Sequence, residues 1–382
     1  MAKSKSGLMI QQGLVDEPGP LEKKFEGCMT VDRSKVRECI DRTLKAYRER
    51  KGLYSFVHHL TNGPQHIYVP DGVEKGSPEH LRYFFFVTPT DHMQDSRTLY
   101  SNHLHLYADQ PWLYSEKVLE LGKGELAKTF QKYKIGLHNE NARFWVNNAQ
   151  TLQEFGGDPV RIFKHCGSTV EGALAWREKY KKEHKRSPLL GFEHKITSLY
   201  MLYLAEFGGL RFPKDAFAVD VHVIFQMLQV GAVVLHKRMD NTQVARVIRE
   251  LICDECAYRP YEDKIDLANA LWLRGNEGCN GCSKNKAAPI LCSIYDMCQG
   301  RFATDNYHHN GTIDPQDPIF PKGGQLKFGI QRFTRHRPEK KGRGQIIVKR
   351  RETLFDAEFA EEKAAQTKSR KVIPITSAKK LF

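Results

Sequence analysis

The sequence predicts a mainly α-helical fold. Apolar residues recur at helical spacing in three stretches, 142–152, 196–207 and 244–252. From residue 78 to residue 300 the chain reads as successive helices separated by Gly, Pro and Asn, with few of the alternating patterns that are typical of strands. The apolar faces of these three helical stretches are expected to pack into a core rather than to hold a cofactor.

Four zones are expected along the chain. Residues 1–77 form an N-terminal extension with one helical stretch, 36–51, and residues 78–300 form the helical domain. Residues 301–330 are rich in turn signals and are expected to be a linker. Residues 331–382 carry 15 Lys+Arg and 6 Asp+Glu, which predicts a basic C-terminal arm.

The boundaries of several helices can be anticipated from local signals. The stretch 142–152 is expected to end at Gly156-Gly157, and Asn241 is expected to cap the stretch 244–252. A further helix is expected over 223–228, with Asp220 as its candidate N-cap.

The charge and cysteine content narrow the class of protein. The chain has 59 Lys+Arg and 45 Asp+Glu, a net charge of +14, which favours polyanionic partners such as nucleic acid or anionic membrane surfaces. The sequence has neither an apolar run of about 18 residues nor an apolar secretory signal, so a soluble intracellular protein is expected. In that setting nine cysteines are not expected to form a disulfide framework.

Residues 189–195, Leu-Leu-Gly-Phe-Glu-His-Lys, predict a tight glycine turn followed by a helix. The first amides of such a helix have no partner within it and point outward, which suits a phosphate. One glycine before one helix is more often a plain turn, so this signal alone is weak.

Asp220 lies within an apolar run, Phe217-Ala-Val-Asp-Val-His-Val223. A carboxylate in such surroundings is costly to bury unless it is hydrogen-bonded. It can cap the following helix, and a capping carboxylate can at the same time face a nucleotide.

These motifs resemble those of the helix-hairpin-helix (HhH-GPD) DNA glycosylase superfamily, in particular endonuclease III and the adenine glycosylases. The resemblance lies in Leu189-x-Gly191-x-x-x-Lys195 followed by Val219-Asp220-x-His222-Val223. Two upstream segments, 88–91 and 135–142, also match in order, so that the resemblance covers roughly residues 80–300. It implies a two-lobed helical fold with an iron–sulfur loop and extra N- and C-terminal segments.

The resemblance also implies site residues. Lys195 would attack C1′ of the sugar as a neutral amine, and Asp220 would activate the nucleophile or stabilise a sugar cation. Gly191, Glu193, His194 and Thr88 would contact DNA.

Two departures from the family pattern stand in this region. Glu193 replaces the second hairpin glycine, and the arginine that usually follows shortly after the histidine is absent beyond His222. They put the usual DNA-backbone contacts and ordinary repair chemistry in doubt.

Four cysteines predict a metal centre. Cys279-x2-Cys282-x9-Cys292-x5-Cys298 places four thiols within 20 residues, which suits a [4Fe–4S] cluster or a tetrahedral zinc. The family resemblance favours the cluster, although the family pattern is C-x6-C-x2-C-x5-C. Lys284 and Lys286 lie on this loop and would contact the DNA backbone. Cys253 and Cys256 could join a second site but are more simply buried or reactive thiols.

Three functions are compatible with these features. The first is a DNA N-glycosylase with abasic-site lyase activity on a damaged or modified base. The second is a phage-type amino-acid:DNA transferase, which adds an amine to an activated methyl carbon of thymine. The third is a non-catalytic DNA-binding module. In each case we expect a monomer that binds double-stranded DNA and no membrane, in the cytoplasm or nucleoid, or in the host cytoplasm if the gene belongs to a phage.

Overall fold

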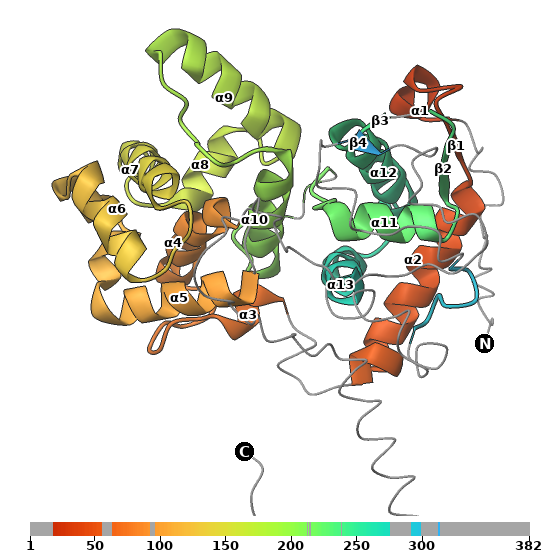
Figure 1. Cartoon of the computed structure of the whole chain (residues 1–382), viewed down its shortest axis with the longest axis horizontal. Coiled ribbons are helices and arrows are strands. Elements are labelled where there is room, and N and C mark those ends of the chain that lie inside the picture. The colour runs from red at the N-terminus through yellow and green to blue at the C-terminus, as the bar shows by residue number, and fades with distance from the viewer. Residues whose placement is uncertain are drawn as a thin grey trace, which may run out of the picture.

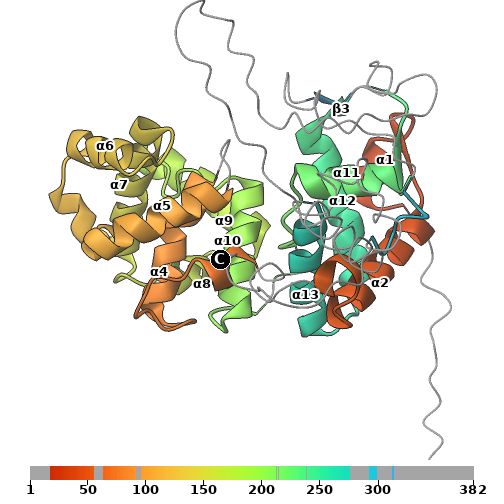
Figure 2. The same ribbon diagram turned by 60° about the horizontal axis from the view of Figure 1, so that its bottom comes forward.

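The computed structural model describes residues 18–55, 63–91, 96–211, 213, 215–237, 239–275, 292–298 and 312–313. This part of the chain is mainly α-helical, as predicted. Figure 1 shows the helices in two groups, here called lobe 1 and lobe 2, and the turned view in Figure 2 keeps the two groups apart.

Lobe 1 is formed by the middle of the chain. Its helices are α3 (Pro64–Ile67), α4 (Pro78–Val87), α5 (Ser96–Asp109), α6 (Lys123–Lys132), α7 (His138–Glu154), α8 (Pro159–His165), α9 (Val170–His184) and α10 (His194–Glu206). Three short 3₁₀ turns, Thr88–Thr90, Pro111–Tyr114 and Glu116–Glu120, connect them.

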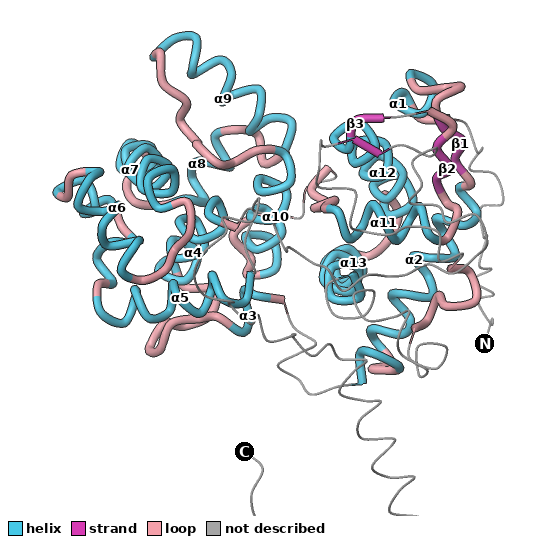
Figure 3. The backbone as a smooth tube through the Cα atoms, viewed as in Figure 1, coloured by secondary structure: helices cyan, strands magenta, loops and turns pink. Residues whose placement is uncertain are grey.

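Lobe 2 combines both ends of the described chain. Its helices are α1 (Pro20–Lys24), α2 (Arg33–Arg48), α11 (Val221–Gln229), α12 (Asn241–Cys256) and α13 (Tyr261–Leu273), with a 3₁₀ turn at Gly52–Ser55. Its strands are β1 (Met29–Val31), β2 (Val233–Leu235), β3 (Met239–Asp240) and β4 (Thr312–Ile313). β1 pairs antiparallel with β2, and β3 pairs antiparallel with β4 (Figure 3).

Residues 19–55 form part of lobe 2. α2 packs against α12 and α13, and Arg48 forms ion pairs with Asp263 at 2.5 Å and with Asp266 at 2.9 Å. Residues 19–55 of the predicted N-terminal extension therefore share a core with α11–α13. The predicted linker contributes β4, whereas the predicted basic arm, 331–382, lies outside the described residues.

Polar caps fix where the helices begin. Asp32 accepts a hydrogen bond from the amide of Lys35 at the start of α2, and Thr169 accepts one from Gly172 at the start of α9. The predicted cap of α12 was placed one residue too late, because Asp240 rather than Asn241 accepts the hydrogen bond from Thr242. Within the described part of the chain, no helix has the length and apolarity that a membrane span requires.

α10 is the helix of lobe 1 that stands on the side of lobe 2 (Figure 1). It packs against α4 and α9 in lobe 1 and against α13 in lobe 2. At its C-terminal end, Glu206 accepts hydrogen bonds from His66 Nε2 at 2.7 Å and from the Asn269 side chain at 3.2 Å. The apolar stripe predicted over 196–207 thus serves both lobes, which explains why nine of the thirteen residues of α10 are buried.

The core of lobe 1 encloses two neutral histidines. His103 is fully buried, with its ring stacked on Trp145 at a centroid distance of 5.5 Å, and burial lowers the pKa of His103 to about 3. His80 is also fully buried, and burial lowers its pKa to about 4, against an opposing hydrogen bond with the carbonyl of Gln65.

Acid is expected to destabilise lobe 1 through these two imidazoles. Because their pKa values in the folded chain lie below the ordinary value of 6.5, the unfolded chain takes up protons first as the pH falls. Stability should therefore fall below about pH 6.5, by up to about 1.4 kcal/mol per pH unit for each histidine. Urea unfolding at about pH 7 and about pH 5 should show a smaller loss in His103→Gln than in the exposed control His105→Gln. An equal loss would exclude His103 as a cause.

Candidate functional site

The turn predicted at Gly191 is held firmly against α7. Gly191 has a φ of +79°, and a Cβ at this position would lie 2.8 Å from Phe144 Cδ2 and 2.9 Å from Pro89 Cβ. The preceding residue, Leu190, exchanges two hydrogen bonds with the buried side chain of Asn148, at 2.8 and 3.0 Å. Glycine is therefore required here both by the backbone conformation and by the space.

Gly191→Ala is expected to destabilise the chain by about 2–4 kcal/mol, the sum of the strain at positive φ and the overpacking against Phe144. The matched control is Gly208→Ala, since Gly208 has a φ of +77° but a Cβ added there would meet nothing within 4 Å. The control should lose only about 1–2 kcal/mol. Urea unfolding of both variants measures the difference, and equal losses would show that the packing at Gly191 is unimportant.

The first turn of α10 is open. Glu193 is its N-cap residue but makes no side-chain capping hydrogen bond. Within the described part of the chain, the amides of His194 and Lys195 have no acceptor. Unpaired amides at the positive end of a helix dipole suit an anion.

Glu193 is instead paired with an arginine of α9. Arg177 lies 3.1 Å from Glu193 Oε1, and its Nη1 also donates a hydrogen bond to the carbonyl of Phe192 at 2.7 Å. The acid that replaces the expected hairpin glycine is thus neutralised by a neighbouring cation. Sequence reasoning did not identify Arg177, because it reaches Glu193 from the preceding helix rather than from the turn.

His194 and Lys195 begin α10 side by side but differ in their contacts. His194 Nε2 lies 2.9 Å from Arg249 Nη1 and 3.0 Å from Glu171 Oε1. Burial, followed by the charge of Arg249, lowers the pKa of His194, so that its neutral ring accepts a hydrogen bond from Arg249. The side chain of Lys195 makes no hydrogen bond or ion pair with the residues that the structure describes, and the residue is half-buried.

Arg249 of α12 joins the start of α10 to the segment that leads to Asp220. Besides contacting His194, it donates a hydrogen bond from Nε to the carbonyl of Phe217 at 3.2 Å. Burial lowers the pKa of Arg249 to about 10, which leaves it charged at neutral pH. Arg249 lies among the buried positions Ala245, Ile252 and Cys256 of α12, and a charged residue within such a stripe was the signal that could have identified it.

Asp220 is the N-cap of α11, as predicted. Its Oδ1 accepts hydrogen bonds from the amides of His222 at 2.9 Å and Val223 at 3.1 Å. Its other oxygen, Oδ2, accepts no hydrogen bond from the described residues, although the residue is only 8% exposed. α11 begins on the side that faces α10 and ends beside β2 (Figures 1 and 3). A nearly buried carboxylate thus keeps one oxygen available.

The predicted site residues fall into three groups. Gly191, Glu193, His194 and Lys195 form one continuous segment, which Arg249 links to the segment before Asp220. Thr88 does not join them, and here the expected DNA contact is not supported: its side chain is fully buried, and its hydroxyl donates to the carbonyl of Phe84 at 2.6 Å. In this conformation Thr88 presents no surface to a duplex.

The third group contains the cysteine motif. Cys279, Cys282, Lys284 and Lys286 lie outside the described residues, and the described residues contain no group of three or more metal-binding side chains.

Cys292 and Cys298 flank a short turn in lobe 2, in which the amide of Cys298 donates to the carbonyl of Ile294 at 3.0 Å. Burial raises the pKa of the Cys292 thiol, while the charge of the buried Arg274 opposes that shift. The net shift favours the neutral thiol, so a metal bound at Cys292 would have to supply the charge that stabilises a thiolate there.

Known protein families, curated proteins and solved structures were compared with this chain, and none of them matched it.

Proposed function

We propose that this chain is a base-flipping enzyme of the HhH-GPD glycosylase fold that acts on a damaged or modified base in double-stranded DNA. In its simplest form it would be an N-glycosylase with abasic-site lyase activity. The observation that carries this proposal is Asp220: one carboxylate oxygen is fixed by the amides at the start of α11, and the other accepts no hydrogen bond from the described residues. Arg249 joins the segment before Asp220 to the first residue of α10, so the carboxylate and the open helix start belong to one hydrogen-bonded region.

Each part of the site would have a defined role. The open amides at the start of α10 would bind a backbone phosphate and hold the duplex where the two lobes meet. Asp220 Oδ2 would stabilise the positive charge that develops on the sugar as the glycosidic bond breaks. The Nζ of Lys195 would attack C1′ as the base departs, and loss of a proton and ring opening would yield a Schiff base that leads to a strand nick.

Four cysteines would hold a [4Fe–4S] cluster, or alternatively zinc: Cys279, Cys282, Cys292 and Cys298. The charge of Arg274 beside Cys292 would offset part of the cost of a buried thiolate at that position. The bound group would supply rigidity to the loop rather than reaction chemistry. Lys284 and Lys286 on the same loop would then press against the DNA backbone.

The lyase step can be tested by trapping with borohydride. The full chain, incubated with duplex DNA that contains an abasic site, should form a covalent complex that borohydride makes permanent. Lys195→Gln should lose this complex, whereas Lys128→Gln, an exposed residue of α6 paired with Glu125, should retain it. Trapping that persists in Lys195→Gln would assign the nucleophile elsewhere.

The second candidate is the amino-acid:DNA transferase. It is favoured by Glu193, which stands where the repair enzymes carry their second hairpin glycine. Glu193 forms an ion pair with Arg177. Incubation with DNA that contains 5-phosphomethyluracil and with amino acids, followed by digestion and mass spectrometry, separates the two. An aminoacylated thymidine would indicate transfer, and an abasic site would indicate glycosylase activity.

A further inference from the structure

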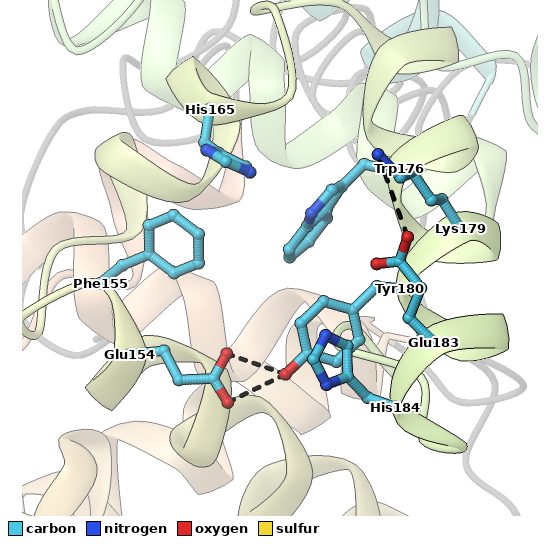
Figure 4. Close-up of a pocket in the computed structure, with 8 residues that line it drawn as sticks. All are labelled: Glu154, Phe155, His165, Trp176, Lys179, Tyr180, Glu183 and His184. Atoms are coloured by element: carbon cyan, nitrogen blue, oxygen red, sulfur yellow. Dashed lines mark hydrogen bonds and ion pairs between the residues drawn. The ribbon is translucent and has the colours of Figure 1, made fainter.

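A pocket of about 350 Å³ lies at the surface of lobe 1, where α7 and α8 end beside the second half of α9. Its walls are mostly aromatic: Phe155, His165, Trp176 and Tyr180 surround a central opening, and Glu154 and Glu183 stand at its edge (Figure 4). None of these side chains belongs to the DNA site proposed above, and that site does not explain why so many rings gather here.

Three of the rings form a corner. The centroid of Trp176 lies 6.0 Å from that of Phe155 and 5.8 Å from that of His165, and the centroids of Phe155 and His165 are 5.3 Å apart. The angles between these ring planes are 86°, 76° and 65°, respectively. A small ligand above this triangle can lie within about 6 Å of all three centroids, the range in which a cation is attracted to a ring face.

The angles also exclude a stacking slot for a flat base. A nucleobase inserted between aromatic side chains needs two roughly parallel faces, and these three rings offer none. A compact and nearly spherical group, in contrast, can touch all three at once. The geometry therefore favours a rounded ligand over a planar one.

Two acids stand at the edge of the pocket, and each already has a cationic partner. Glu154 accepts hydrogen bonds from the Tyr180 hydroxyl at 3.0 and 2.9 Å and pairs with Arg186. Glu183 is held more loosely, with Lys179 at 4.0 Å and about half of its side chain exposed. Arg186 Cζ already lies 5.1 Å from the centroid of Tyr180, so that one ring of this group receives a cation from the chain itself.

We propose that this pocket binds an alkylated ammonium group, with Trp176, Phe155 and His165 around the alkyl substituents and Glu183 near the positive charge. The proposal does not depend on the DNA activity. The same chemistry is found in free choline-like ammonium compounds and in the trimethylated side chain of a lysine in another protein.

The test uses the full chain and follows the indole N–H signals of its tryptophans by nuclear magnetic resonance. Choline should shift the signal of Trp176 with a dissociation constant of about 1 mM. The uncharged analogue of choline, in which carbon replaces nitrogen, should bind at least about tenfold more weakly, because it has the same shape and no charge. Equal binding of the two compounds, or no shift up to about 50 mM choline, would overturn the proposal.

Variants locate the site. Trp176→Ala should weaken choline binding at least about tenfold, and Glu183→Gln should weaken it less. Trp112→Ala should leave it unchanged, because Trp112 is 39% exposed and does not line the pocket. The unfolding midpoint of each variant shows that it is folded, and because Glu183 is an exposed helix residue, Glu183→Gln provides a test that survives even if Trp176→Ala unfolds.

Two further ligands complete the test. A trimethyllysine peptide that binds at least about tenfold more tightly than choline would assign the ligand to a protein, and one that binds no better would assign it to a free ammonium compound. Thymidine binding more tightly than choline would refute the cation site in favour of ring stacking.

Discussion

Asp220→Asn should reduce base release, or base modification, by about 10²–10⁴-fold without unfolding the chain. Asparagine retains an oxygen that can accept the hydrogen bonds of His222 and Val223, so α11 keeps its cap. What disappears is the negative charge at Oδ2, which would stabilise the sugar cation. Single-turnover assays on DNA that contains the modified base, at saturating enzyme, measure the chemical step apart from binding.

The matched control is another N-cap aspartate of the same lobe. Asp240 caps α12 by accepting a hydrogen bond from the amide of Thr242, and it belongs to no predicted site. Asp240→Asn should therefore leave the rate within about twofold of the wild type. DNA affinity should be retained in both variants. If Asp220→Asn were as active as Asp240→Asn, Asp220 would be a cap alone, and a non-catalytic DNA-binding module would become the better description.

Local sequence patterns predicted the helices well. The spacing of apolar residues over 142–152, 196–207 and 244–252 corresponds to α7, α10 and α12, because helical burial leaves a periodic trace in the sequence. The same is true of Asp220, whose position before an apolar run marks a helix start. The four strands were not predicted, since each has only two or three residues and depends on a partner far along the chain.

Contacts between distant segments could not be anticipated. Arg249 meets His194 across 55 residues, and Arg37 pairs with Glu255 across 218 residues. Neither pairing leaves a local pattern, because each depends on how whole helices pack. For the same reason the sequence did not reveal that residues 19–55 complete lobe 2. Thr88 was expected to contact DNA because its segment matches the family motifs in order. In the structure Thr88 is buried, and its hydroxyl donates a hydrogen bond to a carbonyl of its own helix.

If the four cysteines hold the proposed metal, its removal should destabilise lobe 2 by several kcal/mol, as removal of a structural metal does in small domains. Cys292 is partly buried beside the fully buried Arg274, and a metal-bound thiolate at Cys292 would lower the cost of burying that cation. Anaerobically purified chain should show a broad absorption band near about 400 nm if it holds an iron–sulfur cluster. Cys292→Ser and Cys298→Ser should each reduce the bound metal and the free energy of unfolding.

Cys28→Ser separates the loss of a ligand from the loss of a thiol. Cys28 is a partly buried cysteine of the same lobe, beside β1, and lies outside the four-cysteine motif. This variant should keep both the metal and the stability. Cys292 and Cys298 lie next to α2 and α11. Loss of the proposed metal should therefore also loosen α2, and amide hydrogen exchange in α2 can detect this. A colourless chain with stoichiometric zinc would keep the structural role and exclude the iron–sulfur cluster, whereas a metal-free chain of unchanged stability would exclude both.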